Sequence, residues 1–225
     1  MSHIYIPASS AEQWAQFLAE PVKHWRTGFS ARTLAYCWQE ARGFPPEVQA
    51  ALATEELFSG IQPLLALPEH QVSLPGGSRP SQNDIWVLAR AGTGLVSIAV
   101  EGKAAEPFGP TLGEWLAEGS PGKTTRLEFL CNELGLCEPV AGTVRYQLLH
   151  RAASAVIEAK RFCASHAVML VHSFSQTHQW FEDYAAFAVL FDAQAVVNRV
   201  ISAGQVGGVQ LHLCWVRGDE RYLSR

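Results

Sequence analysis

The chain has 225 residues, a length typical of one large domain, and 48% of them are hydrophobic, which is enough for a sizeable core. No apolar run reaches the roughly 18 residues that a bilayer-spanning helix needs. The start of the sequence also lacks the basic and apolar regions of a signal peptide, so we expect a cytoplasmic protein with no membrane partner. The net charge of −4 does not favour a polyanionic partner, although a local basic groove can lie on an acidic protein.

The N-terminal third has the pattern of helices. Residues 10–19 follow a serine that can cap a helix, and residues 30–42 place apolar side chains at helical spacing before Gly43. A shorter helix is expected over 46–52, where a proline stands at the start. The stretch 74–81 is rich in proline, glycine and serine, so we expect a loop between these helices and the next strand.

The middle of the chain changes to strand character. Residues 84–89 form a short apolar run, and residues 95–100 form a second run that is rich in β-branched side chains. Gly92 and Gly94 lie between the two runs, in a segment suited to a tight turn. The sequence therefore predicts a β-hairpin.

Helices and strands alternate in the rest of the chain. We expect helices over 111–117, 124–134, 145–163 and 177–191, and strands over 167–171 and 209–216. Such alternation predicts a single α/β domain over 1–225, with a mixed sheet and helices on its faces.

An acidic and lysine cluster lies across the predicted hairpin. The predicted turn places Asp84 opposite Glu101, with their Cβ atoms about 4.5–5.5 Å apart. Because side chains alternate along a strand, Glu101 and Lys103 point to one face and Gly102 points to the other. Two carboxylates that close repel each other unless a positive charge lies between them, and Mg²⁺ commonly binds such a pair. The alternative is a solvated strand end, in which Glu101 and Lys103 pair with each other.

These residues carry a resemblance to a known family. Asp84, a gap of sixteen residues, and then Glu101-Gly102-Lys103 resemble the signature of the PD-(D/E)XK nuclease superfamily, although Asn83 stands where that motif has proline. The resemblance implies that Asp84 and Glu101 bind Mg²⁺ or Mn²⁺ with help from the Gly102 carbonyl. It also implies that Lys103 is the catalytic lysine.

The order of the predicted elements resembles the restriction-endonuclease-like fold of that superfamily. The resemblance covers a core of about 30–174, in which 71–74 would be the first strand and 145–163 the second helix. Residues 175–225 would form a C-terminal extension of one helix and one strand.

Two further site residues are implied by the family. Many members add a glutamate from the first helix, for which Glu40 is the best candidate by position and Glu47 the second. Some members carry a glutamine early in the second helix, and Gln147 stands in such a place.

The resemblance implies Mg²⁺-dependent hydrolysis of a phosphodiester bond in DNA or RNA. Four cations are candidates for a phosphate-binding surface, with ordinary solvated surface as the alternative: Lys123, Arg126, Arg145 and Arg151. A nuclease-like fold that serves as an interaction module without catalysis is the main alternative function, and a small-molecule hydrolase is a third. Many nucleases of this fold act as homodimers, and the sequence leaves the oligomeric state open.

Overall fold

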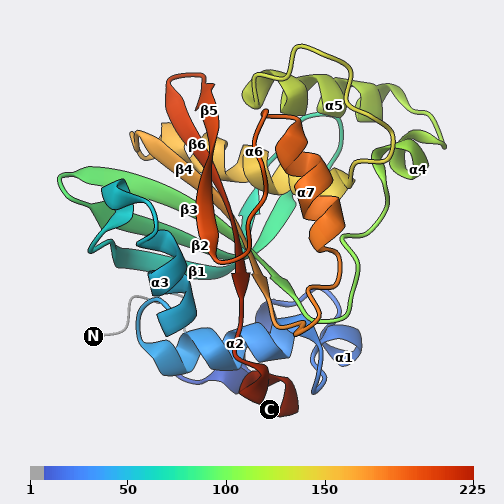
Figure 1. Cartoon of the computed structure of the whole chain (residues 1–225). Coiled ribbons are helices and arrows are strands. Elements are labelled where there is room, and N and C mark those ends of the chain that lie inside the picture. Colours follow the sequence, from blue (N-terminus) through green and yellow to red (C-terminus); the bar gives the residue numbers. More distant parts are fainter. Residues whose placement is uncertain (1–7) are drawn as a thin grey trace.

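The structure, a computed structural model, describes residues 8–225. One mixed sheet contains six strands: β1 (Gln62–Val72), β2 (Ser81–Ala91), β3 (Gly94–Lys103), β4 (His166–Ser173), β5 (Arg199–Val206) and β6 (Val209–Arg217). Their order across the sheet is β1-β2-β3-β4-β6-β5 (Figure 1). The expected absence of a signal peptide concerns residues 1–7, which lie outside the described residues.

Helices cover both faces of this sheet (Figure 1). They are α1 (Pro21–His24), α2 (Ser30–Ala41), α3 (Pro46–Leu52), α4 (Leu112–Leu116), α5 (Pro121–Glu133), α6 (Tyr146–Arg161) and α7 (Phe181–Val189), with the 3₁₀ helices η1 (Ala11–Phe17), η2 (Glu56–Phe58) and η3 (Glu220–Ser224). Two apolar cores result, one beneath α2 and α3 and the other beneath α5, α6 and α7. The predicted α/β class with a mixed sheet is confirmed. Within residues 8–225, no helix combines the length and apolar character needed to cross a bilayer.

The hairpin of β2 and β3 has the predicted turn and register. Ala91 pairs with Gly94 next to the turn, and Ile85 pairs with Val100 at the other end of the ladder. Asp84 and Glu101 follow directly after that last pair, on the face of the sheet that α6 covers. Both strands are longer than predicted, and β3 extends to Lys103.

The first strand differs from the prediction. The expected strand over 71–74 is in fact β1, which begins at Gln62 and runs antiparallel to β2. Pro63 and Pro68 interrupt its strand pattern in the sequence. Proline is nevertheless tolerated here because β1 lies at the edge of the sheet, where an outward-facing N–H group has no strand to bond.

The second half of the sheet depends on parallel pairing. β4 pairs parallel to β3 along its length, from His166 beside Val96 to Ser173 beside Lys103, and the chain between the two strands passes through α6. β6 lies parallel to β4 on the other side. β5 was not predicted, although Gly207 and Gly208 form the turn that joins it to β6.

The predicted helices over 30–42 and 46–52 are confirmed as α2 and α3. The segment predicted as a helix over 10–19 is the 3₁₀ helix η1, and the one predicted over 177–191 is shorter, as α7. The side chain of Thr111 accepts a hydrogen bond from the Glu114 N–H group, which caps α4 within its predicted range.

Candidate functional site

A pocket of about 540 Å³ is lined by residues of the first three strands and of α6. Its charged lining comprises four carboxylates and two cations: Glu69, Asp84, Glu101, Glu106, Lys103 and Arg151. Gln147 and His150 of α6 also line it. The hairpin residues and the glutamine that were singled out in the sequence therefore lie in one pocket.

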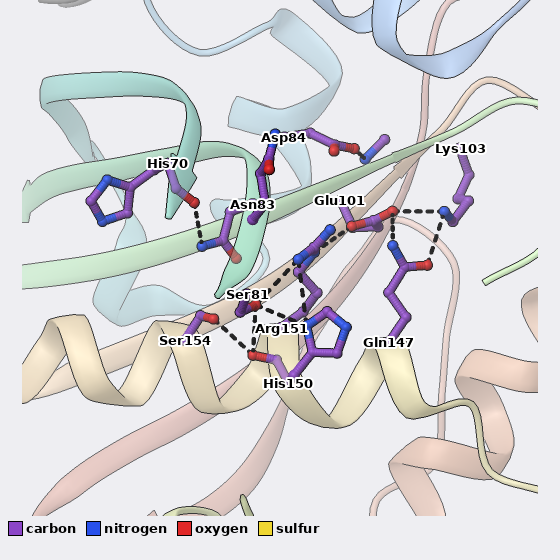
Figure 2. A network of polar contacts seen from close by, with 12 residues as sticks. His70, Ser81, Asn83, Asp84, Glu101, Lys103, Gln147, His150, Arg151 and Ser154 are labelled. Atoms are coloured by element: carbon purple, nitrogen blue, oxygen red, sulfur yellow. Dashed lines mark hydrogen bonds and ion pairs between the residues drawn. The ribbon is translucent and has the colours of Figure 1, made fainter. Parts of the chain in front are cut away.

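Glu101 accepts the most hydrogen bonds of the four carboxylates. It is 2% exposed. Its Oε1 atom accepts hydrogen bonds from Lys103 Nζ at 2.6 Å and Gln147 Nε2 at 2.8 Å, and its Oε2 atom accepts one from Arg151 Nε at 2.5 Å (Figure 2). Burial alone would raise the pKa of Glu101, but the positive charges of Arg151 and Lys103 bring it below the usual value. Glu101 is thus held as a carboxylate between two cations.

Asp84 is held by the backbone of the neighbouring strand. Its Oδ2 atom accepts a hydrogen bond from the Gly102 N–H group at 2.6 Å. A Cβ atom at Gly102 would lie 3.1 Å from Leu34 Cδ2 and 3.2 Å from Asp84 Oδ2, so glycine allows this close approach. Burial, followed by repulsion from Glu101, raises the pKa of Asp84 to about 7.

Glu69 is another carboxylate of the pocket, which the sequence analysis did not identify. It lies opposite Asp84, between the pairs Pro68–Ile85 and His70–Asn83, and its φ angle of 53° lies in the left-handed region. Burial and the negative charge of Asp84 raise its pKa to about 8. The surrounding protein therefore disfavours the charged forms of Asp84 and Glu69.

Two residues of α6 complete the arrangement. Gln147 Oε1 accepts a hydrogen bond from Lys103 Nζ at 3.2 Å, so the amide contacts both members of the predicted Glu101–Lys103 pair (Figure 2). Arg151 follows one turn later on the same side of the helix and is 6% exposed. The sequence analysis assigned Arg151 to a surface. Its spacing of four residues from Gln147 was the available signal that it also reaches the site.

A family model covers this whole arrangement, matching residues 7–220. The chain belongs to that family, which is described as a domain of unknown function (DUF6946). Comparison with curated proteins and with solved structures found no match. The description of the DUF6946 family assigns no activity to the pocket.

Glu40 does not join the pocket of this DUF6946 member. Its carboxylate accepts hydrogen bonds from Tyr222 Oη and Arg225 Nη2, each at 3.1 Å. The pocket is lined by Ser30 and Ala31, at the start of α2. Ten residues of helix separate Ser30 from Glu40, a rise of about 15 Å. The prediction that Glu40 binds the metal is therefore wrong, and Glu69 of β1 supplies a carboxylate to the pocket instead.

Glu47, the second candidate for the helix glutamate, belongs to another cluster. Its Oε1 atom lies 3.2 Å from His172 Nε2 and 3.5 Å from Cys37 Sγ. Within residues 8–225, these three residues are the one group of three or more His, Cys, Asp or Glu whose ligand atoms all lie within 4.8 Å of one another. The oxygen atoms of the pocket carboxylates therefore lie farther apart than the ligand atoms of this cluster.

This second cluster has the chemistry of a hydrogen-bond network. Trp38 Nε1 donates to His172 Nδ1 at 3.1 Å, which leaves the ring proton of His172 on Nε2, facing Glu47. Burial raises the pKa of the Cys37 thiol far above its usual value, so the thiol is protonated in the metal-free protein. Trp38, His172, Glu47 and Cys37 thus satisfy one another without an ion.

Three of the four predicted phosphate-binding cations have other partners. Arg126 donates to the carbonyl groups of the loop after β1, Arg145 pairs with Asp183 at 2.9 Å, and Lys123 pairs with Glu118 at 3.1 Å. Among the four, Arg151 is the one that lines the pocket.

Proposed function

We propose that this pocket binds Mg²⁺ or Mn²⁺ and hydrolyses a phosphodiester bond in DNA or RNA. The observation that carries the proposal is the contact of Gln147, on α6, with both Glu101 and Lys103 of the hairpin. Together with Asp84, these residues form the set implied by the resemblance to the PD-(D/E)XK nuclease superfamily. The strand order β1-β2-β3-β4, with β4 parallel to β3, also supports the restriction-endonuclease-like fold.

The carboxylates that would bind the metal are Asp84 and Glu69. In the part of the chain that the structure describes, Asp84 Oδ1 and Glu69 Oε1 accept no hydrogen bond, whereas the second oxygen of each residue is bonded. The raised pKa of both groups reflects burial and crowded negative charge, which a divalent cation would relieve. The Gly102 carbonyl remains a further proposed ligand. A cation bound here would polarise a phosphate oxygen and lower the pKa of a bound water.

The cations of the protein have a separate role in this proposal. Lys103 is held by Glu101 and Gln147, so its ammonium group is fixed in place before a substrate arrives. From that position it would stabilise the negative charge that develops on the phosphate oxygens. Arg151 compensates Glu101 from the other side, so that Lys103 is not the sole counter-charge of that carboxylate.

One observation favours the alternative of a binding module without catalysis. Both oxygens of Glu101 are already bonded by Arg151, Lys103 and Gln147, so this carboxylate is satisfied without a metal ion. A small-molecule phosphodiesterase would use the same carboxylates as the nuclease, and the two activities differ only in the substrate that is cleaved.

The deciding experiment is a cleavage assay with single- and double-stranded DNA and RNA and with bis(p-nitrophenyl) phosphate, in Mg²⁺, in Mn²⁺ or in EDTA. The variants are Glu101→Gln and Lys103→Met, with Lys160→Met as a control, because Lys160 pairs with Glu133 outside the pocket. We expect metal-dependent cleavage that falls roughly 100- to 1,000-fold in the two pocket variants and is unchanged in the control.

The other outcomes separate the alternatives. Cleavage of the small diester alone would indicate the small-molecule hydrolase. A folded wild type that cuts nothing and binds no Mn²⁺ by calorimetry would reject the enzyme and leave the binding module. Sedimentation of the same samples tests the homodimer that the resemblance implies.

A further inference from the structure

His150 lies in the pocket but takes no part in the bonds around Glu101. It stands on α6 one turn after Gln147 (Figure 2). Its Nδ1 atom lies 2.8 Å from Ser81 Oγ and 3.4 Å from Arg151 Nη1. Within the described residues, its Nε2 atom has no hydrogen-bond partner, and this atom is not among the buried polar atoms that lack one. The Nε2 atom is therefore accessible from the pocket.

The contacts of Nδ1 determine where the ring carries its proton. An arginine side chain has donors and no acceptor, so the Nδ1 atom that Arg151 contacts presents a lone pair. Arg151 Nη1 also donates to Ser81 Oγ at 3.2 Å, and the Ser81 hydroxyl lies 3.2 Å from the His150 carbonyl oxygen, to which it donates, so the Arg151 contact is the one that assigns Nδ1 as an acceptor. A neutral ring with Nδ1 as acceptor carries its proton on Nε2, toward the pocket.

Two features keep this donor neutral and in place. Burial, followed by the positive charges of Arg151 and Arg126, brings the pKa of His150 well below its usual value. The ring lies 4.8 Å from the ring of Tyr146, which stacks on Trp115 at 3.9 Å. His150 thus presents a fixed N–H group without adding positive charge beside the carboxylates.

We propose that His150 Nε2–H donates a hydrogen bond to a phosphate oxygen of the substrate. Lys103 supplies a positive charge to an anion bound in this pocket. The neutral His150 ring would add a hydrogen bond to that anion without repelling a metal ion held by Asp84 and Glu69. The inference rests on the proposed function, because it takes the substrate to be a phosphodiester. It assigns His150 to substrate binding and not to metal binding.

The test compares side chains that place a donor differently. The amide of His150→Gln puts an N–H group near the position of Nε2, the amide of His150→Asn puts one near Nδ1, and His150→Ala removes both. Calorimetry measures the affinity of each protein for thymidine 5′-monophosphate in Ca²⁺, and for Mn²⁺ alone. We expect nucleotide affinity to fall roughly 10- to 100-fold in His150→Ala and His150→Asn, to stay within about threefold of wild type in His150→Gln, and Mn²⁺ affinity to be unchanged.

Equal nucleotide affinity in all four proteins would overturn the inference and leave the metal site standing. So would an equal loss in His150→Gln, which would indicate that only the packing of the ring matters. If the wild type binds no Mn²⁺, the proposed function fails, and the same ranking is then measured with inorganic phosphate at low salt. A ranking with glutamine near wild type would still support His150 as the phosphate donor, and no ranking would reject it.

Discussion

Arg151 Nε lies 2.5 Å from Glu101 Oε2, and both side chains are almost fully buried. The arginine comes from α6 and the glutamate from β3, so this ion pair joins the helix to the centre of the sheet. The two partners are fifty residues apart in the chain. Correct docking of α6 is therefore a condition for the charge balance of the pocket.

Replacement of Arg151 by methionine should destabilise the protein. The substitution leaves Glu101 buried with one cation in place of two, and removal of one partner of a buried pair costs about 3–5 kcal/mol. Urea unfolding at neutral pH measures the loss in free energy of unfolding. The double variant Arg151→Met/Glu101→Gln should recover part of it, because no unpaired carboxylate is left. Single and double variants of equal stability would argue against this explanation.

The stability of the metal-free protein should depend on Asp84 as the pH rises. The pKa of Asp84 is raised from 3.8 to about 7, so the folded state disfavours its charged form. The stability that this group contributes is fully present below its unfolded pKa and is lost as the pH rises through about 7. Urea unfolding between about pH 5 and pH 9 should show a decline that is smaller in Asp84→Asn. Parallel profiles for the two proteins would contradict the assignment.

A methyl group at Gly102 should disturb both stability and metal binding. A Cβ atom there would press on Leu34 and on the Asp84 carboxylate, at 3.1 and 3.2 Å. We expect Gly102→Ala to cost about 1–3 kcal/mol and to weaken Mn²⁺ binding. Gly43→Ala is the control, since its Cβ would meet nothing closer than 3.9 Å. Thermal unfolding and calorimetry on both variants test this, and wild-type behaviour of Gly102→Ala would exclude the close packing.

Two glutamates provide a matched pair for the metal site. Glu69 lines the pocket, whereas Glu40 bonds to Tyr222 and Arg225. We expect Glu69→Gln to reduce Mn²⁺ affinity roughly 10- to 100-fold, and Glu40→Gln to leave it unchanged. Calorimetric titration of both variants is sufficient. Similar losses in both, or in neither, would remove Glu69 from the metal site.

The hairpin and its carboxylates were predictable because they depend on local chemistry. A turn with two glycines fixes the register of the strands on either side, and that register brings Asp84 to Glu101. These hairpin features need only neighbours in the chain, whereas Gln147 was implied by the family resemblance as a glutamine early in the second helix.

The missed features depend on contacts between distant segments. β1 lies at an edge, where Pro63 and Pro68 are tolerated, so its sequence does not have the pattern of a strand. Glu69 points into the pocket from a backbone conformation that glutamate rarely adopts. Arg151 had the pattern of a solvated residue, because the spacing of residues along a helix does not show that Arg151 packs against the buried carboxylate of Glu101 on the sheet.

The prolines of β1 also bear on how copies of the protein can associate. A strand from another molecule can add to a sheet only by hydrogen bonding to N–H and C=O groups along its outer border. Pro63 and Pro68 each lack an N–H group. Directly after Pro68, the backbone at Glu69 is in the left-handed region and not in the extended conformation of a strand. This border is a poor template for such addition, which protects the strand that carries Glu69 from intermolecular β-pairing.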